Sequence, residues 1–87
     1  MEVTVKRIVT LTEGGPVKAY CEVALDEQFL IKGVRVVEGA RGMFVSMPRQ
    51  QTKTGQWVDR VEPLTQDAKD GLTRVVLDAY HHHLAAA

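Results

Sequence analysis

One stretch of this 87-residue chain has the periodicity of an amphipathic helix, and it lies near the C-terminus. Its apolar residues recur at the spacing that places side chains on one face of a helix: Ala68, Leu72, Val75, Val76, Ala79 and Tyr80. Thr65 is a suitable N-cap, and Asp67 favours the positive end of the helix dipole. Gly71 inside this helix costs about 1 kcal/mol relative to Ala, a cost that close packing at this position would explain.

Five strands are expected before the helix. Alternating or short apolar runs predict them at residues 2–10, 17–25, 29–37, 43–47 and 57–61. Turn chemistry separates them at residues 13–16, 26–28 and 38–42, and the polar residues 49–56 predict a loop. The chain is therefore expected to form a single α+β domain over residues 1–87, with an antiparallel sheet of about five strands and one C-terminal amphipathic helix.

The strand expected at residues 29–37 has apolar side chains on both faces. One side carries Leu30, Val34 and Val36, and the other carries Phe29, Ile31 and Val37. Gly33 within the strand suggests a bulge or a close backbone approach. One helix covers only one face of a sheet, and a second copy of the chain is the economical cover for the other. We therefore predict a homodimer whose interface contains four apolar residues, Phe29, Ile31, Val37 and Phe44.

The overall composition is neutral, but the charge is unevenly distributed. The formal net charge is zero, which argues against attraction of the whole surface to nucleic acid. Residues 29–61 nevertheless hold six Lys or Arg and two Asp or Glu, a balance of +4. Cys21 is the only cysteine, and its apolar surroundings in the sequence fit a core position in a cytoplasmic, reducing setting. A signal peptide or a membrane-spanning stretch of about 20 apolar residues is not seen, so we expect no membrane partner.

The sequence offers no set of residues for catalysis. The histidines are His81, His82 and His83, and consecutive helical residues point about 100° apart, so the three cannot converge on one metal ion. Without another histidine, neither a Ser-His-Asp nor a Cys-His arrangement can be assembled. Gly39 and Gly42 are not followed by the Lys-Ser/Thr of a phosphate-binding loop. We therefore expect no enzyme, no cofactor, no metal and no small-molecule substrate.

The polar segment after Pro48 is the candidate surface for nucleic acid. Arg49 and Lys53 can contact phosphates, and Gln50 and Gln51 can hydrogen-bond to bases or backbone. Two further cations flank this region and extend its basic character, Arg35 and Arg41. The nearby aromatic residues leave two alternatives open: Trp57 and Phe44 either stack on bases or belong to the core.

Several short segments, taken in order, resemble a known bacterial family. Before the expected helix there are three such segments: Leu25-Asp26-Glu27 ahead of a strand that begins with Phe, Val34-Arg35-Val36 ahead of Gly39, and Gly42-Met43-Phe44-Val45 ahead of Met47-Pro48. The fourth segment lies in the helix and reads Val75-Val76-Leu77-Asp78-Ala79-Tyr80. In this order and spacing they resemble stage V sporulation protein G, the SpoVG family of septation proteins. The resemblance extends over about residues 1–81.

The resemblance implies a small cytoplasmic homodimer that binds DNA, and in some members RNA. It also implies a link to septation, sporulation and gene control. In the family a Lys-Arg pair after Met-Pro-Ser carries much of the contact with nucleic acid. Here Gln50 and Gln51 stand in place of that pair, Arg49 replaces the Ser, and Lys53 follows. This departure and the neutral charge also fit a second hypothesis, a protein-interaction adaptor of the division or transcription apparatus without significant affinity for nucleic acid.

Overall fold

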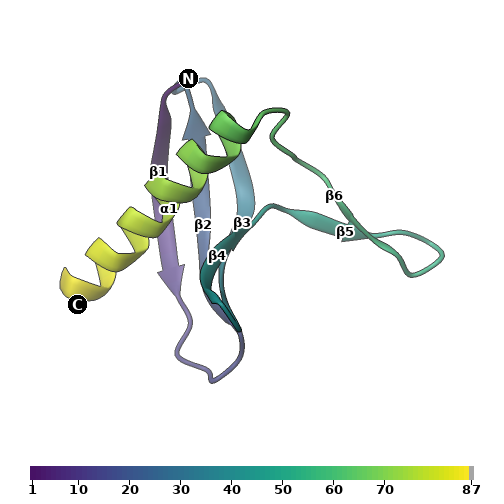
Figure 1. The fold of residues 1–87 in the computed structure, drawn as a ribbon, viewed down its shortest axis with the longest axis horizontal. Helices are drawn as coiled ribbons and strands as arrows, with labels where there is room; N and C mark the ends of the chain where they lie inside the picture. The colour runs from purple at the N-terminus through teal and green to yellow at the C-terminus, as the bar shows by residue number, and fades with distance from the viewer. Residues whose placement is uncertain (87) are drawn as a thin grey trace.

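The structure, a computed structural model, describes residues 1–86 as a sheet crossed by one helix, with a hairpin that protrudes from the body (Figure 1). In chain order the elements are β1 (Val3–Thr10), β2 (Val17–Leu25), β3 (Phe29–Gly39), β4 (Gly42–Ser46), β5 (Arg49–Gln51), β6 (Trp57–Asp59) and α1 (Gln66–Ala86). The N-terminus and the end of α1 lie at opposite ends of the body (Figure 1). The predicted α+β class with a single C-terminal helix is confirmed for the described residues.

The strands form two sheets rather than one. β1, β2, β3 and β4 form a four-stranded antiparallel sheet in that order, whereas β5 and β6 form a separate two-stranded sheet. The predicted single sheet of about five strands is therefore wrong, and part of the expected polar loop is β5. Pro48 follows β4 and has no N–H for a ladder hydrogen bond, so the chain leaves the main sheet there.

A tight turn joins β2 to β3, as the polar step at residues 26–28 predicted. Gln28 N–H donates to the Leu25 carbonyl at 2.9 Å, and Asp26 and Glu27 have positive φ values of 52° and 55°. Residues 26–28 form the loop, and φ is positive at both central residues of its Leu25–Gln28 turn, which matches the twist of the flanking strands. The start of the chain is fastened to this turn, because Asp26 N–H donates to the Glu2 carbonyl at 2.7 Å.

The core lies between α1 and one face of the four-stranded sheet. Its buried side chains come from two central strands and the helix: Ala19, Cys21 and Val23 of β2, Val34 and Val36 of β3, and Leu72, Val76 and Tyr80 of α1. Burial of each Val or Leu side chain contributes about 1.5–3 kcal/mol relative to leaving it exposed. Three members of the predicted helical stripe are thus confirmed as core residues, and Cys21 is confirmed as one.

A bulge at Gly33 changes which β3 side chains face the helix. Gly33 has a φ of 86°, and the pairing of β2 with β3 shifts register between Cys21 and Glu22. Because the extra residue offsets the alternation, Ile31 packs against the same core as Val34. The prediction that Ile31 lies on the second face is therefore wrong, although the bulge itself was expected from Gly33.

The start of α1 follows the predicted capping pattern. Ala68 N–H donates to the Thr65 hydroxyl oxygen at 3.1 Å, which satisfies one of the free donors of the first turn. The suggestion of close packing at Gly71 is wrong, because a Cβ atom added there would meet no other atom within 4 Å.

Candidate nucleic-acid interface

The sheet has an open face, which we define as the face turned away from α1. Partner residues on neighbouring strands share a face, so its side chains form rows across the strands. Starting near the N-terminus, the rows are Thr4 with Ala24 and Leu30; Arg7 with Glu22 and Lys32; Val9 with Tyr20, Arg35 and Ser46; and Val17 with Val37 and Phe44.

Two aromatic rings of the open face are only half buried. Tyr20 is 44% exposed and Phe44 is 47% exposed, and they lie on different strands and in adjacent rows. Phe44 packs over the backbone of Gly39, where an added Cβ would come within 2.9 Å of the ring. The alternative that Phe44 is a buried core residue is therefore wrong.

The middle of the open face is basic. Arg7, Lys32 and Arg35 lie in its two central rows, where the acidic residue is Glu22. Arg35 donates from Nη2 to the Ser46 hydroxyl oxygen at 3.0 Å, which orients its guanidinium along the row. Within residues 1–86, none of these three cations belongs to an ion pair.

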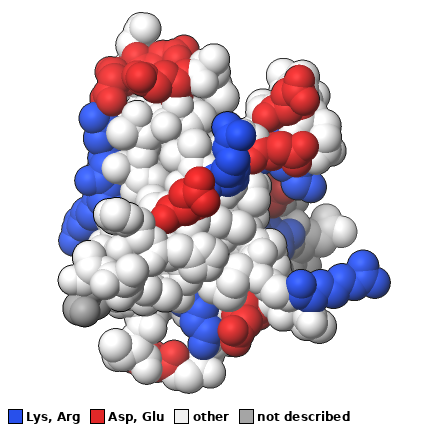
Figure 2. All heavy atoms as spheres, turned by 60° about the vertical axis from the view of Figure 1, so that its left-hand side comes forward, with Lys and Arg blue, Asp and Glu red and all other residues white. Residues whose placement is uncertain are grey.

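Figure 2 shows how these charges are arranged on the surface. A column of Lys and Arg side chains runs along its left edge, on the side that lies behind the sheet in Figure 1. An acidic cap lies above the column, at the height of the turn between β2 and β3. Glu2, Asp26 and Glu27 belong to this end of the molecule, and Lys6 pairs with Glu27 at 2.6 Å. The open face is thus basic next to an acidic end.

The second candidate surface is the arm, which we define as residues 48–60. It extends away from the body (Figure 1), and every residue from 49 to 60 is exposed. Its shape comes from hairpin hydrogen bonds: Arg60 N–H donates to the Pro48 carbonyl at 2.8 Å, and Thr52 N–H donates to the Gln56 carbonyl at 2.7 Å. Trp57 is 57% exposed on this arm, so the alternative that it is a core residue is wrong.

Two of the predicted contact residues on the arm already have partners within it. Arg49 Nε lies 3.1 Å from an Asp59 carboxylate oxygen, and Gln51 Nε2 donates to the Gly55 carbonyl at 3.2 Å. Gln50 lies opposite Val58, on the other face of the ribbon, and Lys53 lies in the loop between β5 and β6. The arm therefore presents Gln50 and Lys53 as polar side chains that make no side-chain hydrogen bond or ion pair in the described chain.

The six residues predicted to bind nucleic acid fall in three places. Arg49, Gln50, Gln51 and Lys53 lie on the arm, Arg35 lies on the open face, and Arg41 lies in the turn between β3 and β4. Sequence reasoning did not include Tyr20, Arg7 and Lys32 among the contact residues, although all three share the open face with Arg35. In the alternation of its strand Tyr20 lies on the side opposite the apolar residues, and this position could have indicated an exposed ring.

The four residues predicted for the dimer interface do not form one surface. Val37 and Phe44 are cross-strand partners on the open face, whereas Ile31 packs against the helix-side core. Phe29 is 74% exposed and pairs with Leu25 at the end of the sheet near the N-terminus. The bulge at Gly33 is the reason for this separation, because it places the two ends of β3 out of phase.

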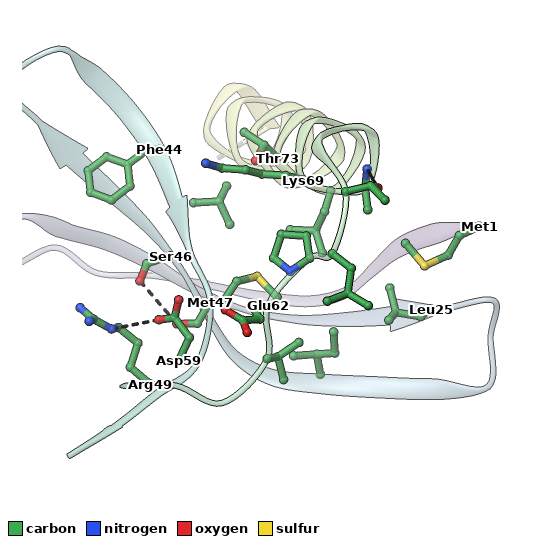
Figure 3. Close-up of a pocket in the computed structure, with 18 residues that line it drawn as sticks. Met1, Leu25, Phe44, Ser46, Met47, Arg49, Asp59, Glu62, Lys69 and Thr73 are labelled. Carbon is green, nitrogen blue, oxygen red and sulfur yellow. Dashed lines mark hydrogen bonds and ion pairs between the residues drawn. The ribbon is translucent and has the colours of Figure 1, made fainter. Parts of the chain in front are cut away.

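A groove of about 780 Å³ lies between the first turns of α1, the edge of the sheet and the segment that joins the arm to the helix. Its lining is mainly apolar and includes Met1, Leu25, Ile31, Met47 and Leu72. Figure 3 shows Lys69 and Thr73 reaching over it from the helix, while the Phe44 ring points away from its centre.

Residues outside the open face, the arm and the groove form no reactive or metal-binding site in the described range. Burial raises the pKa of the Cys21 thiol, which keeps it protonated and unreactive. Across residues 1–86, no group of three or more His, Cys, Asp and Glu side chains is arranged to hold a metal ion. The one helix in the described range is not apolar enough over its length to cross a membrane.

The chain matches the family model for SpoVG over residues 1–82. It is similar to proteins named "Putative septation protein SpoVG" in three organisms. The identity is 40% to the protein of Desulforudis audaxviator, with 99% of this chain and 98% of the relative covered. The identity to the protein of Archaeoglobus fulgidus is 42%, with 91% of this chain and 93% of the relative covered. The identity to the protein of Heliobacterium modesticaldum is 36%, with 100% of this chain and 98% of the relative covered.

Proposed function

Because the chain belongs to the SpoVG family, we propose that it is a small cytoplasmic regulator that binds nucleic acid as a homodimer and acts in septation, sporulation or related gene control. It acts by binding and not by catalysis. The observation that carries the proposal is the arm, a polar two-stranded ribbon that stands clear of the body (Figure 1). The name of the relatives, which are called septation proteins, supports the link to septation.

The shape of the arm supports contact with duplex DNA. The major groove is about 12 Å wide and admits a two-stranded ribbon. Gln50 projects from one face of this ribbon, and Gln side chains pair with the exposed edge of adenine. Lys53 in the connecting loop supplies a cation for a phosphate. The ion pair of Arg49 with Asp59 holds the two strands in register at the base of the arm.

Exposed apolar side chains support the homodimer. The three most exposed large hydrophobic residues are Leu64 (93%), Phe29 (74%) and Met1 (72%). All three belong to the end of the molecule where β1, β3 and α1 begin, and the groove opens between two of them, Met1 and Leu64. A second copy that covers this end would bury apolar area on both subunits. Sedimentation equilibrium tests this part, and we expect Leu64→Ser combined with Phe29→Ser to weaken the dimer.

Binding across a salt series tests the proposal as a whole. We expect the protein to bind a short DNA duplex with an affinity that falls as salt rises, because phosphate contacts release counterions. Arg49→Ala combined with Lys53→Ala should weaken binding more than the matched pair Lys6→Ala and Lys18→Ala, which lies outside the arm. A Kd that stays above roughly 10⁻⁴ M at low salt, for both duplex and single strand, would refute the proposal.

A gain-of-charge variant provides an independent check on the arm. Gln50→Lys combined with Gln51→Arg adds two cations to a ribbon that protrudes into solvent. If the arm lies against phosphates, the slope of log K against log salt should steepen by about two. The same two charges placed elsewhere, as in Gln28→Lys and Gln66→Arg, should leave the slope nearly unchanged.

A protein-interaction adaptor is the second candidate, and the pairing of Arg49 with Asp59 favours it because the arm then offers few free cations. Capture of partners from lysate with and without nuclease separates the two candidates. Partners that persist after nuclease treatment would support the adaptor, and partners lost with the nucleic acid would support the regulator.

A further inference from the structure

We propose that the open face is a second nucleic-acid site, specific for unpaired strands, on which Tyr20 and Phe44 stack against two bases. This inference rests on the proposed function, but it uses a surface that the arm does not include. Neither ring serves the core: Tyr20 is 44% exposed and Phe44 is 47% exposed. Aromatic side chains on a sheet stack well on bases because every base has a π-face.

The two rings have a spacing that suits separate bases. Tyr20 lies opposite Arg35, which lies opposite Ser46, and Phe44 stands two residues before Ser46 on β4. Two strand spacings and one two-residue step place the rings on the order of 12 Å apart. Four-stranded sheets that bind RNA stack two or three bases on aromatic residues in a comparable arrangement.

The cations lie where a backbone crossing this face would pass. Arg35 is in the row of Tyr20, and Arg7 and Lys32 are in the next row. Within the described chain these three have no ion-pair partner, so their charges are available to phosphates. Glu22 is the single acidic residue of these rows, which leaves the centre of the face with a net positive charge.

The geometry favours an unpaired strand over a duplex. Bases in a duplex stack on each other, so rings on a protein surface have no free base to meet. A four-stranded sheet is also roughly 14 Å across its backbones alone, which exceeds the major groove of about 12 Å. The narrow arm fits a groove, whereas the broad open face does not.

The same charges argue against a second copy of the chain on this face. A two-fold interface sets the same patch of both subunits together, so the cations of one subunit would approach those of the other. Lysine is depleted at subunit interfaces, yet Lys32 lies in a central row here. The open face therefore fits a polyanion better than it fits itself.

Binding of a labelled oligonucleotide of about 15 nucleotides, as single strand and as duplex, tests the inference. We expect Tyr20→Ala and Phe44→Leu each to weaken single-strand binding about tenfold and to leave duplex binding unchanged. Tyr20→Phe keeps the ring and should retain wild-type binding. Leu84→Ala truncates an exposed apolar side chain on α1, outside the open face, and is the matched control.

Nuclear magnetic resonance of the unmodified protein gives a second readout that does not depend on the variants folding. The ring protons of Tyr20 and Phe44 should shift on addition of the single strand, and those of Trp57 on the arm should not. Wild-type single-strand binding in both ring variants would overturn the inference while the proposed function stands. Loss of the dimer in these variants, measured by sedimentation, would overturn it by identifying the face as a subunit interface. Absence of binding to either form of nucleic acid would refute the inference and the proposed function together.

Discussion

The body and the arm of this small protein are stabilised in different ways. In the body, α1 and the four-stranded sheet enclose a core of side chains that are almost fully buried, such as Val23, Val36 and Val76. In the arm, residues 49–60 are exposed, and the shape depends on hairpin hydrogen bonds and one ion pair. Burial of apolar area is the dominant favourable term in folding, so the stability of the whole chain resides in the body. Side chains of the arm can therefore be substituted with little effect on the stability of the fold.

The largest expected effect separates the two regions directly. Leu72→Ala removes a buried side chain from the helix-sheet core and should lower the free energy of unfolding by about 2–5 kcal/mol. Val58→Ala on the arm should change it by no more than about 0.5 kcal/mol. Urea denaturation followed by circular dichroism measures both. A loss of more than about 2 kcal/mol for the arm variant would show that the arm is part of the cooperative unit.

A pair of glycines with similar backbone angles sharpens the comparison. Gly33 in the body has a φ of 86° and Gly55 in the arm has a φ of 90°, and an L side chain is strained at both. Gly33→Ala should lower global stability by about 1–2 kcal/mol, because the bulge positions the core residues of β3. Gly55→Ala should leave the denaturation midpoint nearly unchanged.

The effect of Gly55→Ala should instead be local to the arm. Thr52 and Gln56 are joined by a hydrogen bond across the loop, and their amides should exchange faster with solvent in the variant. Hydrogen exchange measured residue by residue detects this change. Equal losses of global stability in the two glycine variants would contradict the separation of arm and body.

Gly71 offers a stabilising change within the body. A Cβ at this position meets no other atom within 4 Å, and the residue lies inside α1. Gly71→Ala should therefore raise the free energy of unfolding by about 0.4–1 kcal/mol through helix propensity and reduced freedom of the unfolded chain. A thermal melt monitors the change. A lower melting temperature would indicate that a partner packs closely against this turn of the helix.

The smallest expected effect concerns the ion pair of the arm. Asp59→Asn removes the partner of Arg49 in a pair whose side chains are 41% and 45% exposed. The free energy of unfolding should fall by at most about 1 kcal/mol, because exposed pairs are well solvated. Duplex binding should become tighter, since Arg49 is then free to contact a phosphate. Weaker binding in this variant would mean that the shape of the arm matters more than its charge.

The sequence predicted the body better than the arm, for a physical reason. The helical stripe, the Thr65 cap and the turn at residues 26–28 follow from local spacing and turn chemistry, and the structure contains all three. The arm depends on which strand pairs with which, and strand pairing is not encoded by the periodicity of a single segment. For the same reason the strand predicted at residues 57–61 is wrongly expected in the main sheet, whereas Trp57–Asp59 pairs with β5 as β6.

The candidate surfaces show the same limit. The sequence placed Arg49 and Lys53 in one polar segment, and the structure keeps them together on the arm. It could not show that Arg35 shares a face with Tyr20, because that depends on cross-strand register. The single offset at Gly33 moved Ile31 from the expected interface into the core region. One bulge therefore changed the predicted surface more than any error in recognising the strands.

The positions of the two chain ends have a mechanical consequence. The N-terminus lies at one end of β1, whereas α1 ends at the opposite end of the body (Figure 1). A force that pulls these ends apart acts at one end on β1, which is hydrogen-bonded to β2, and at the other on α1, which contacts the sheet through side-chain packing. The backbone hydrogen bond between Asp26 and Glu2 would bear the load from its first moment. Stretched from its ends, this domain should therefore lose the packing of α1 before its sheet opens, and the arm, which links β4 to α1, should carry the tension next.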